Sequence, residues 1–190
     1  YVKKSGAKLA FNPGTFQLRG DKELMMQCFA QSEVLFINVQ EAQGILASTD
    51  KNIKNLLTEM RKLGPAIAVI TDGPNGGYVF DGKDYFYIPE FTLERVETTG
   101  AGDSFGTAFI AALHHGKSID EAMRWASFNA SSVVMFIGPQ EGLLTKPAIE
   151  QQLETYPEYK AIVFTDKNET PVLPPFKSPA VEANPDNQKI

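Results

Sequence analysis

At residues 97–106 the chain reads Glu-Thr-Thr-Gly-Ala-Gly-Asp-Ser-Phe-Gly. Gly100 and Gly102 have no β-carbon, so backbone N–H groups can converge there in a tight turn. An apolar helix is predicted to follow from Ser104 to about His115, and its unpaired N–H groups and positive dipole end lie at the same loop. This combination predicts an anion site, and phosphate is the anion that suits it best.

The loop ends on a carboxylate, Asp103, whose position allows two interpretations. In the first, Asp103 caps the helix that follows, a role worth about 1 kcal/mol. In the second, it accepts the proton of a hydroxyl group that attacks a bound phosphoryl group. The loop is not a Walker A motif, since no lysine follows its second glycine, and Gly106 stands one place too late for the dinucleotide fingerprint. The spacing alone leaves both interpretations open.

The segments before the loop alternate between strand and helix patterns. Residues 34–38 and 66–71 are continuous apolar runs, which are typical of strands covered on both faces. Helices are predicted between them, at 41–47 and 51–63. Such a strand–helix–strand order predicts an α/β fold, in which a parallel sheet carries helices on its faces.

Further elements complete this organisation. Asp81-Gly82 lies between two β-rich stretches, 78–80 and 85–88, and predicts a hairpin. The other predicted elements are a strand at 7–12, helices at 21–30, 119–136 and 146–154, and an edge strand at 161–164. Five prolines and few large apolar side chains predict a mobile tail at 166–190, after a folded part at 1–165.

The composition excludes several classes of protein. With 43% hydrophobic and 22% charged residues, the 190-residue chain suits one globular domain. A net charge of −5 supplies no basic stripe for nucleic acid, and no apolar run reaches the roughly 18 residues that span a bilayer. Cys28 is the one cysteine and cannot form an internal disulfide, which favours a reducing, cytoplasmic compartment. We therefore expect neither a nucleic-acid nor a membrane partner.

Five ordered motifs give the chain a specific resemblance. Residues 98–105 resemble the second signature of the ribokinase-like, or PfkB-type, carbohydrate kinases, which usually reads Asp-Thr-Thr-Gly-Ala-Gly-Asp-Thr-Phe. Four more stretches resemble motifs of that family in the right order: the Asn-x-x-Glu motif at 38–41, the Thr-x-Gly-x-x-Gly turn at 71–77, a helix near the nucleotide base at 129–130, and the closing glycine loop at 137–142. Together they cover about residues 7–155.

The resemblance implies a ribokinase-like fold, a three-layer α/β/α arrangement with a mostly parallel sheet. Family members are usually considerably longer, and their first half supplies the lid strands, a Gly-Gly signature and most sugar contacts. The resemblance therefore implies that this chain is the C-terminal, nucleotide-binding and catalytic part, without the N-terminal half and lid. We expect it to be a truncated chain that is inactive, or nearly so, by itself.

The resemblance also implies an activity, ATP-dependent transfer of phosphate to a hydroxymethyl group of a sugar, nucleoside or related small molecule. In such kinases the residue that matches Asp103 is the catalytic base. The backbone of Gly100, Ala101 and Gly102 would form the anion hole for the transferring γ-phosphoryl group, an electrostatic role. The full-length parent is a candidate homodimer.

Further residues match the nucleotide and metal sites of the family. Asn38 and Glu41 would act near the phosphates and Mg²⁺. Glu41 would contact the ion through water, because Mg²⁺ gives up its waters reluctantly. The residues expected to contact the nucleotide are Thr71, Gly73, Gly76 and Asn129, the last beside the adenine or ribose.

Each of these residues also has a purely structural interpretation. Asn38 at the end of a strand is often a turn residue, and Glu41 suits the start of a helix. The turn at 71–77 could serve only to join a strand to a hairpin. Asn129 alone would most often be a hydrogen-bonded polar residue of a helix.

The first position of the signature departs from the family pattern, since Glu97 stands where the family usually has Asp. In many members this position and the second threonine, here Thr99, help to hold a monovalent cation that orders the anion hole. Glutamate is longer by one methylene, which leaves activation by K⁺ open.

Two alternatives to a kinase stay open at this point. The chain could be a nucleotide-binding module without catalytic activity, although the presence of Asp103 argues against this. It could also be a half-fold that needs a partner chain, because an abrupt start leaves a strand edge unpaired.

Overall fold

The computed structural model of the chain describes residues 1–93, 95–165, 171 and 173–177. Its helices are α1 (Val2–Ser5), α2 (Thr15–Leu18), α3 (Lys22–Gln31), α4 (Val39–Leu46), α5 (Ile53–Lys62), α6 (Ala101–His114), α7 (Ile119–Val133) and α8 (Lys146–Thr155), with a 3-10 turn η1 at Gly73–Asn75. Its strands are β1 (Leu9–Phe11), β2 (Ser32–Asn38), β3 (Ile67–Thr71), β4 (Gly77–Phe80), β5 (Tyr85–Ile88), β6 (Phe91–Thr92), β7 (Ile162–Phe164) and β8 (Phe176–Lys177). The predicted tail at 166–190 lies outside the described residues, apart from 171 and 173–177. Within the described part of the chain, no helix has both the length and the apolar character needed to cross a membrane.

Six of the described strands form the central sheet, in the order β1-β2-β3-β4-β5-β7. The pairs β1–β2 and β2–β3 are parallel, and the three pairs that follow are antiparallel. Four strands, β1, β2, β3 and β5, consequently point in the same direction. The hairpin between β4 and β5 turns at Asp81-Gly82, where the carboxylate of Asp81 accepts hydrogen bonds from two backbone N–H groups. The predicted α/β class is confirmed, as is the hairpin.

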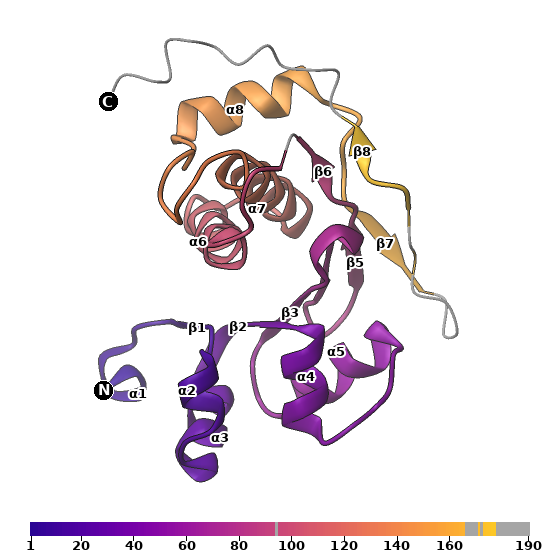
Figure 1. Ribbon diagram of the computed structural model, residues 1–190. Coiled ribbons are helices and arrows are strands. Elements are labelled where there is room, and N and C mark those ends of the chain that lie inside the picture. The colour runs from indigo at the N-terminus through magenta and orange to yellow at the C-terminus, as the bar shows by residue number, and fades with distance from the viewer. Residues whose placement is uncertain (94, 166–170, 172, 178–190) are drawn as a thin grey trace.

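Helices cover both faces of this sheet, with α3, α4 and α5 on one side and α6 and α7 on the other (Figure 1). Successive side chains of a strand point to opposite faces, so a doubly covered strand is apolar throughout. Along β2, Leu35 and Ile37 join a buried cluster with residues of α3, α4 and α5. Val34 and Phe36 join a second cluster with residues of α6 and α7. These two clusters confirm the three-layer α/β/α arrangement.

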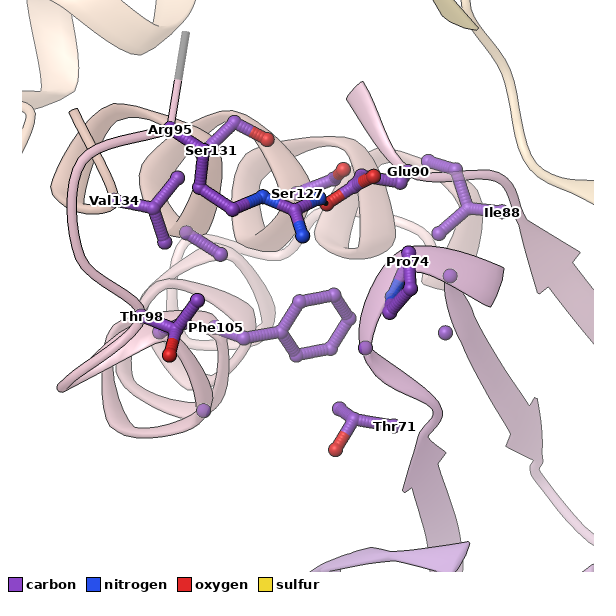
Figure 2. Close-up of a pocket in the computed structure, with 16 residues that line it drawn as sticks. Thr71, Pro74, Ile88, Glu90, Arg95, Thr98, Phe105, Ser127, Ser131 and Val134 are labelled. Carbon is purple, nitrogen blue, oxygen red and sulfur yellow. Dashed lines mark hydrogen bonds and ion pairs between the residues drawn. The ribbon is translucent and has the colours of Figure 1, made fainter. Parts of the chain in front are cut away.

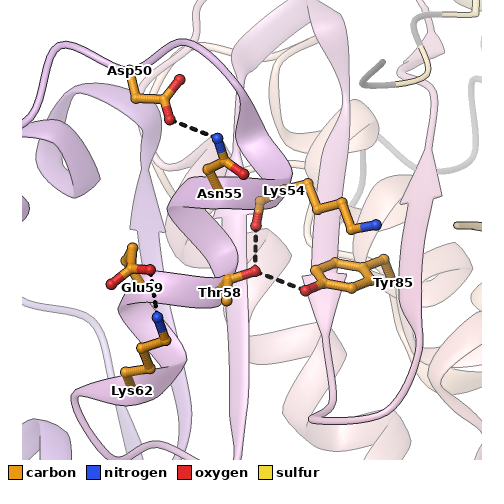
Figure 3. Close-up of polar contacts among 7 residues, drawn as sticks. All are labelled: Asp50, Lys54, Asn55, Thr58, Glu59, Lys62 and Tyr85. Atoms are coloured by element: carbon orange, nitrogen blue, oxygen red, sulfur yellow. Dashed lines mark hydrogen bonds and ion pairs between the residues drawn. The ribbon is translucent and has the colours of Figure 1, made fainter. Parts of the chain in front are cut away.

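Polar contacts hold α5 at its start and against the sheet (Figure 3). The side chain of Asn52 accepts a hydrogen bond from the backbone N–H of Asn55 and caps the helix. The side-chain amide of Asn55 donates to the carboxylate of Asp50 at 2.8 Å, and the hydroxyl groups of Thr58 and Tyr85 lie 2.7 Å apart. Hydrogen bonds from the Asn52 backbone and the Asn55 side chain lower the pKa of Asp50. This network belongs to the scaffold, where it fixes the first turn of α5.

The carboxyl ends of three parallel strands meet at one edge of the sheet. β1 is followed directly by Asn12, β2 ends on Asn38, and β3 ends on Thr71. In open α/β sheets, ligands bind in the crevice outside the carboxyl ends of the strands. The fold therefore gathers these polar side chains where a binding site is expected.

Candidate active site

The glycine-rich loop leads directly into α6, which begins at Ala101 and not at Ser104 as predicted. The cap position belongs to Gly100, whose φ of 83° lies in the left-handed region that favours glycine. A β-carbon on Gly100 would lie 2.8 Å from the Cα atom of Pro139 in the closing loop, so side chains are excluded there. The earlier start places Gly102 and Asp103 in the first turn of α6, where backbone N–H groups have no intrahelical acceptor.

Two neighbouring cavities open beside this loop. The larger has a volume of about 360 Å³ and the smaller of about 190 Å³. Thr71 and Gly102 line both of them, so the cavities adjoin at the carboxyl end of β3 and the first turn of α6.

The larger cavity has mainly apolar walls, which Figure 2 shows in close-up. The ring of Phe105 projects across it, between Thr71 on one side and the guanidinium of Arg95 on the other. Arg95 forms an ion pair with Glu90, and both residues line the cavity. Such a space, apolar with a few polar groups, suits a planar organic group such as a nucleobase.

The glycine turn after β3 forms another wall of the larger cavity. Thr71, Gly73 and Gly76 line it, so all three predicted nucleotide contacts on this turn come together. Gly76 has a φ of 98°, and a β-carbon there would lie 2.1 Å from the carbonyl oxygen of Ile88. The turn also joins β3 to β4, as the structural interpretation requires.

The smaller cavity is polar and contains the predicted base. It is lined by Asp103, Asn38 and Glu41, and also by Asn12. The side-chain amide of Asn12 donates to Oδ1 of Asp103 at 3.5 Å, the long end of the hydrogen-bond range. Since Gly100 holds the cap position, Asp103 is not the cap of α6, and its exposed carboxylate faces this cavity.

Asn38 and Glu41 are joined in a capping box at the start of α4. The side chain of Asn38 accepts from the backbone N–H of Glu41, and Oε2 of Glu41 accepts from the backbone N–H of Asn38, both at 2.8 Å. The expected role of Glu41 at the start of a helix is therefore confirmed, whereas Asn38 caps α4 and is not a turn residue. The capping box engages one of the two carboxylate oxygens of Glu41 and leaves both residues on the cavity wall.

Asn129 lies elsewhere than the other predicted nucleotide contacts. It is buried in α7, where its amide nitrogen donates to the carbonyl oxygen of Ser104 at 2.9 Å and its amide oxygen accepts from the backbone N–H of Leu144 at 2.8 Å. It is not among the residues that line the two cavities. Its side chain fastens α6 and the segment before α8 to α7, and its contact with a nucleotide stays a prediction.

Glu97 connects the two glycine-containing loops. Its carboxylate accepts hydrogen bonds from the hydroxyl of Thr99 and from the backbone N–H of Gly138, the latter at 2.9 Å. These two hydrogen bonds, that of Thr99 first, lower the pKa of Glu97. The predicted pair of Glu97 and Thr99 is thus brought together at the base of the loop. Among the described residues there is no group of three or more His, Cys, Asp or Glu side chains that could hold a metal ion.

Asn12 is the residue of this site that sequence reasoning missed. The sequence predicts Asn12 only as the last residue of the strand at 7–12, which Pro13 and Gly14 end. The signal that could have found it is its place as a polar residue at the carboxyl end of a parallel strand.

Comparison with known proteins agrees with this arrangement. Residues 1–146 match the family described as pfkB family carbohydrate kinase. A ribokinase of Bacillus subtilis is 41% identical over 97 residues, which are 51% of this chain and 33% of that protein. A ribokinase of Haemophilus influenzae is 28% identical over 156 residues, which are 80% of this chain and 49% of that protein. The chain spans half or less of the length of these relatives.

Solved structures show the same fold. The structure of Arabidopsis thaliana ribokinase complexed with ribose and ATP superposes with a TM-score of 0.70 at 25% identity, over 80% of this chain and 49% of that one. A Burkholderia thailandensis nucleoside kinase in complex with inosine gives a TM-score of 0.70 at 21% identity, over 84% and 52% of the two chains. The expected ribokinase-like fold is confirmed. Since the family match extends over most of its residues, the chain belongs to the pfkB family of carbohydrate kinases.

Proposed function

We propose that the polypeptide to which these residues belong is an ATP-dependent kinase that phosphorylates a hydroxymethyl group of a sugar or nucleoside. The observation that carries the proposal is the place of Asp103, in a polar cavity that adjoins a larger apolar one at Gly102. Two adjoining cavities suit two substrates that must react with each other, and a carboxylate in the smaller one suits removal of a proton.

In this proposal the larger cavity takes the nucleotide. The backbone of Gly73 and Gly76 lets the nucleotide approach closely, and Thr71 lies where the two cavities meet. The γ-phosphoryl group then lies at the first turn of α6, next to Gly102. Asn129 lines neither cavity, but its amide donates to the carbonyl oxygen of Ser104 and so links α7 to the first turns of α6.

The smaller cavity takes the hydroxymethyl group of the acceptor. As the acceptor oxygen bonds to the γ-phosphorus, the Asp103 carboxylate accepts the hydroxyl proton, and the bond from the γ-phosphorus to the bridging oxygen of ADP breaks. Backbone N–H groups of Gly100, Ala101 and Gly102 stabilise the negative charge on the transferring group. The N–H of Ala101 also donates to the carbonyl oxygen of Thr98 at 3.3 Å. Gly102 is the one of the three that lines both cavities, so it is the best placed for this role.

The residues present fit a magnesium ion held through water. Asn38 and Glu41 bring an amide and a carboxylate to the wall of the smaller cavity, and oxygen ligands are those that Mg²⁺ prefers. When bound with ATP, Mg²⁺ neutralises charge on the phosphates. The part of Asn38 and Glu41 is to orient the water molecules between the protein and the ion.

Glu97 and Thr99 fit a monovalent cation less well. Both carboxylate oxygens of Glu97 already accept hydrogen bonds, from Thr99 and from Gly138. These contacts indicate that Glu97 links the loop at 97–106 to the loop at 137–142. No step of the proposed reaction involves K⁺.

Transfer and binding assays on the full polypeptide test the proposal. Transfer of phosphate from ATP to at least one member of a panel of sugars and nucleosides supports it. Calorimetry that detects ATP binding in the presence of Mg²⁺, without transfer to any acceptor, supports the alternative of a non-catalytic nucleotide-binding module. The 190 residues alone are expected to be inactive or nearly so, because they span half or less of the length of their relatives.

A further inference from the structure

Asp103, the proposed base, lies next to Asn12, a residue far from it in the sequence. Asn12 Nδ2 donates to Oδ1 of Asp103 at 3.5 Å, across 91 residues of sequence. Asn12 follows β1 directly, whereas Asp103 lies in the first turn of α6. The two meet because the carboxyl ends of β1, β2 and β3 share one edge of the sheet, and α6 begins at that edge.

The backbone on either side of Asn12 is anchored. On one side the ring of Phe11 packs at 5.9 Å from that of Phe29 in α3, which fixes the end of β1. On the other side Pro13 is buried, and a residue before proline is restricted to extended conformations. The Asn12 side chain itself is exposed to the cavity. The amide is therefore held at a defined place while its side chain stays available to the site.

The residues around Asp103 leave the side-chain amide of Asn12 as the group that can orient its carboxylate. The side-chain donors on the cavity wall are the amides of Asn12 and Asn38 and the hydroxyl of Thr71, and the titratable groups are Asp103 and Glu41. Among the residues that the structure describes, neither lysine nor arginine lines this cavity. An amide that holds Oδ1 leaves Oδ2 for the substrate hydroxyl, and it adds no charge of its own to the cavity.

We propose that Asn12 is a positioning residue, which orients the carboxylate of Asp103 toward the acceptor hydroxyl. This inference rests on the proposed function, in which Asp103 is the base. The long distance is consistent with such a role, because hydrogen bonds of catalytic groups tighten when the substrates are bound.

Two variants of Asn12 in the full polypeptide test this role. Asn12→Ala removes the donor and is expected to lower kcat about 10- to 100-fold, with KM for ATP changed less than about twofold, since the larger cavity is untouched. Asn12→Asp keeps the shape but places a second carboxylate beside Asp103. It is expected to move the acid limb of the pH profile of kcat/KM upward by about one pH unit, an effect that a merely structural role would not produce.

A matched control exists in α5. The amide of Asn55 donates to the carboxylate of Asp50 at 2.8 Å (Figure 3). Neither residue is among those that line the two cavities. Asn55→Ala removes an amide–carboxylate bond of the same kind and is expected to leave kcat and the pH profile unchanged. Circular dichroism and the thermal midpoint establish that each variant is folded. If Asn12→Ala does not fold, the pH profile of Asn12→Asp tests the positioning role.

The outcome separates this inference from the function on which it rests. If Asp103→Asn is inactive while Asn12→Ala and Asn12→Asp match the wild type in kcat and in the acid limb, the positioning role is overturned and the proposed function stands. If Asp103→Asn keeps wild-type turnover, the positioning role falls together with the assignment of Asp103 as the base, whereas the proposed function itself falls only if the wild type transfers phosphate to no acceptor. Loss of kcat in Asn12→Ala together with the shifted limb in Asn12→Asp supports the positioning role.

Discussion

The carboxylate of Glu97 accepts a hydrogen bond from the backbone N–H of Gly138 at 2.9 Å and so joins the signature loop to the closing loop. The hydroxyl of Thr99 binds the other carboxylate oxygen. The residue that departs from the usual signature thus has a role visible in the structure, because its longer side chain reaches a loop 41 residues away.

Glu97→Gln is expected to lower the thermal midpoint at neutral pH, because an amide cannot accept hydrogen bonds at both terminal atoms. The pKa of Glu97 is lowered from its ordinary value of 4.5, so its stabilising contribution is present above that value and is lost as pH falls through the lowered pKa. The difference in thermal midpoint between wild type and variant should therefore be largest near pH 7 and shrink as the pH falls below 4.5. Thermal melts followed by circular dichroism check this, and a difference that stays constant with pH would contradict it.

Gly76→Ala is expected to destabilise the protein by about 1–3 kcal/mol and to weaken ATP binding. The added β-carbon would lie 2.1 Å from the carbonyl oxygen of Ile88, on a residue whose φ of 98° disfavours side chains. Gly44→Ala is the control, because Gly44 lies in α4 with open space around it, and alanine there should stabilise by about 0.5–1 kcal/mol. Urea unfolding and calorimetry with ATP measure both effects. Equal stability of the two variants would refute the argument from Gly76.

Glu41→Gln separates the structural role of Glu41 from its proposed role toward Mg²⁺. Glutamine also serves in a capping box, so the thermal midpoint should stay close to that of the wild type. The lost charge should raise the Mg²⁺ concentration for half-maximal activity about 10- to 100-fold. Titration of activity with Mg²⁺ in the full polypeptide checks this. An unchanged Mg²⁺ requirement would leave Glu41 with the capping role alone.

Much of the fold could be predicted, because strands covered on both faces and helices with a buried side carry strong local patterns. The run at 34–38 became the core of β2, and the glycine loop marked the start of α6 to within three residues. The earlier start of α6 depends on the left-handed conformation of Gly100, where a β-carbon would also meet Pro139. Local sequence does not reveal such a contact.

Other features depend on partners distant in sequence. β6 has two residues, and it forms only because Phe91 and Thr92 pair with Phe176 and Lys177. In α7 residues 122–129 are all buried. Because this stretch has no solvent-exposed side, the sequence could not predict toward which element the side chain of Asn129 points. The partners of Asn12 and Asn129 became visible only once the elements were packed together.

Whether Asp103 is the catalytic base is best tested by the kinetics of Asp103→Asn in the full polypeptide. Asparagine keeps the size of the side chain but cannot accept the hydroxyl proton in the same way. We expect kcat for phosphate transfer from ATP to fall about 10²- to 10⁴-fold, while ATP binding measured by calorimetry changes less than about twofold. Turnover within a few-fold of the wild type would contradict the assignment of Asp103 as the base.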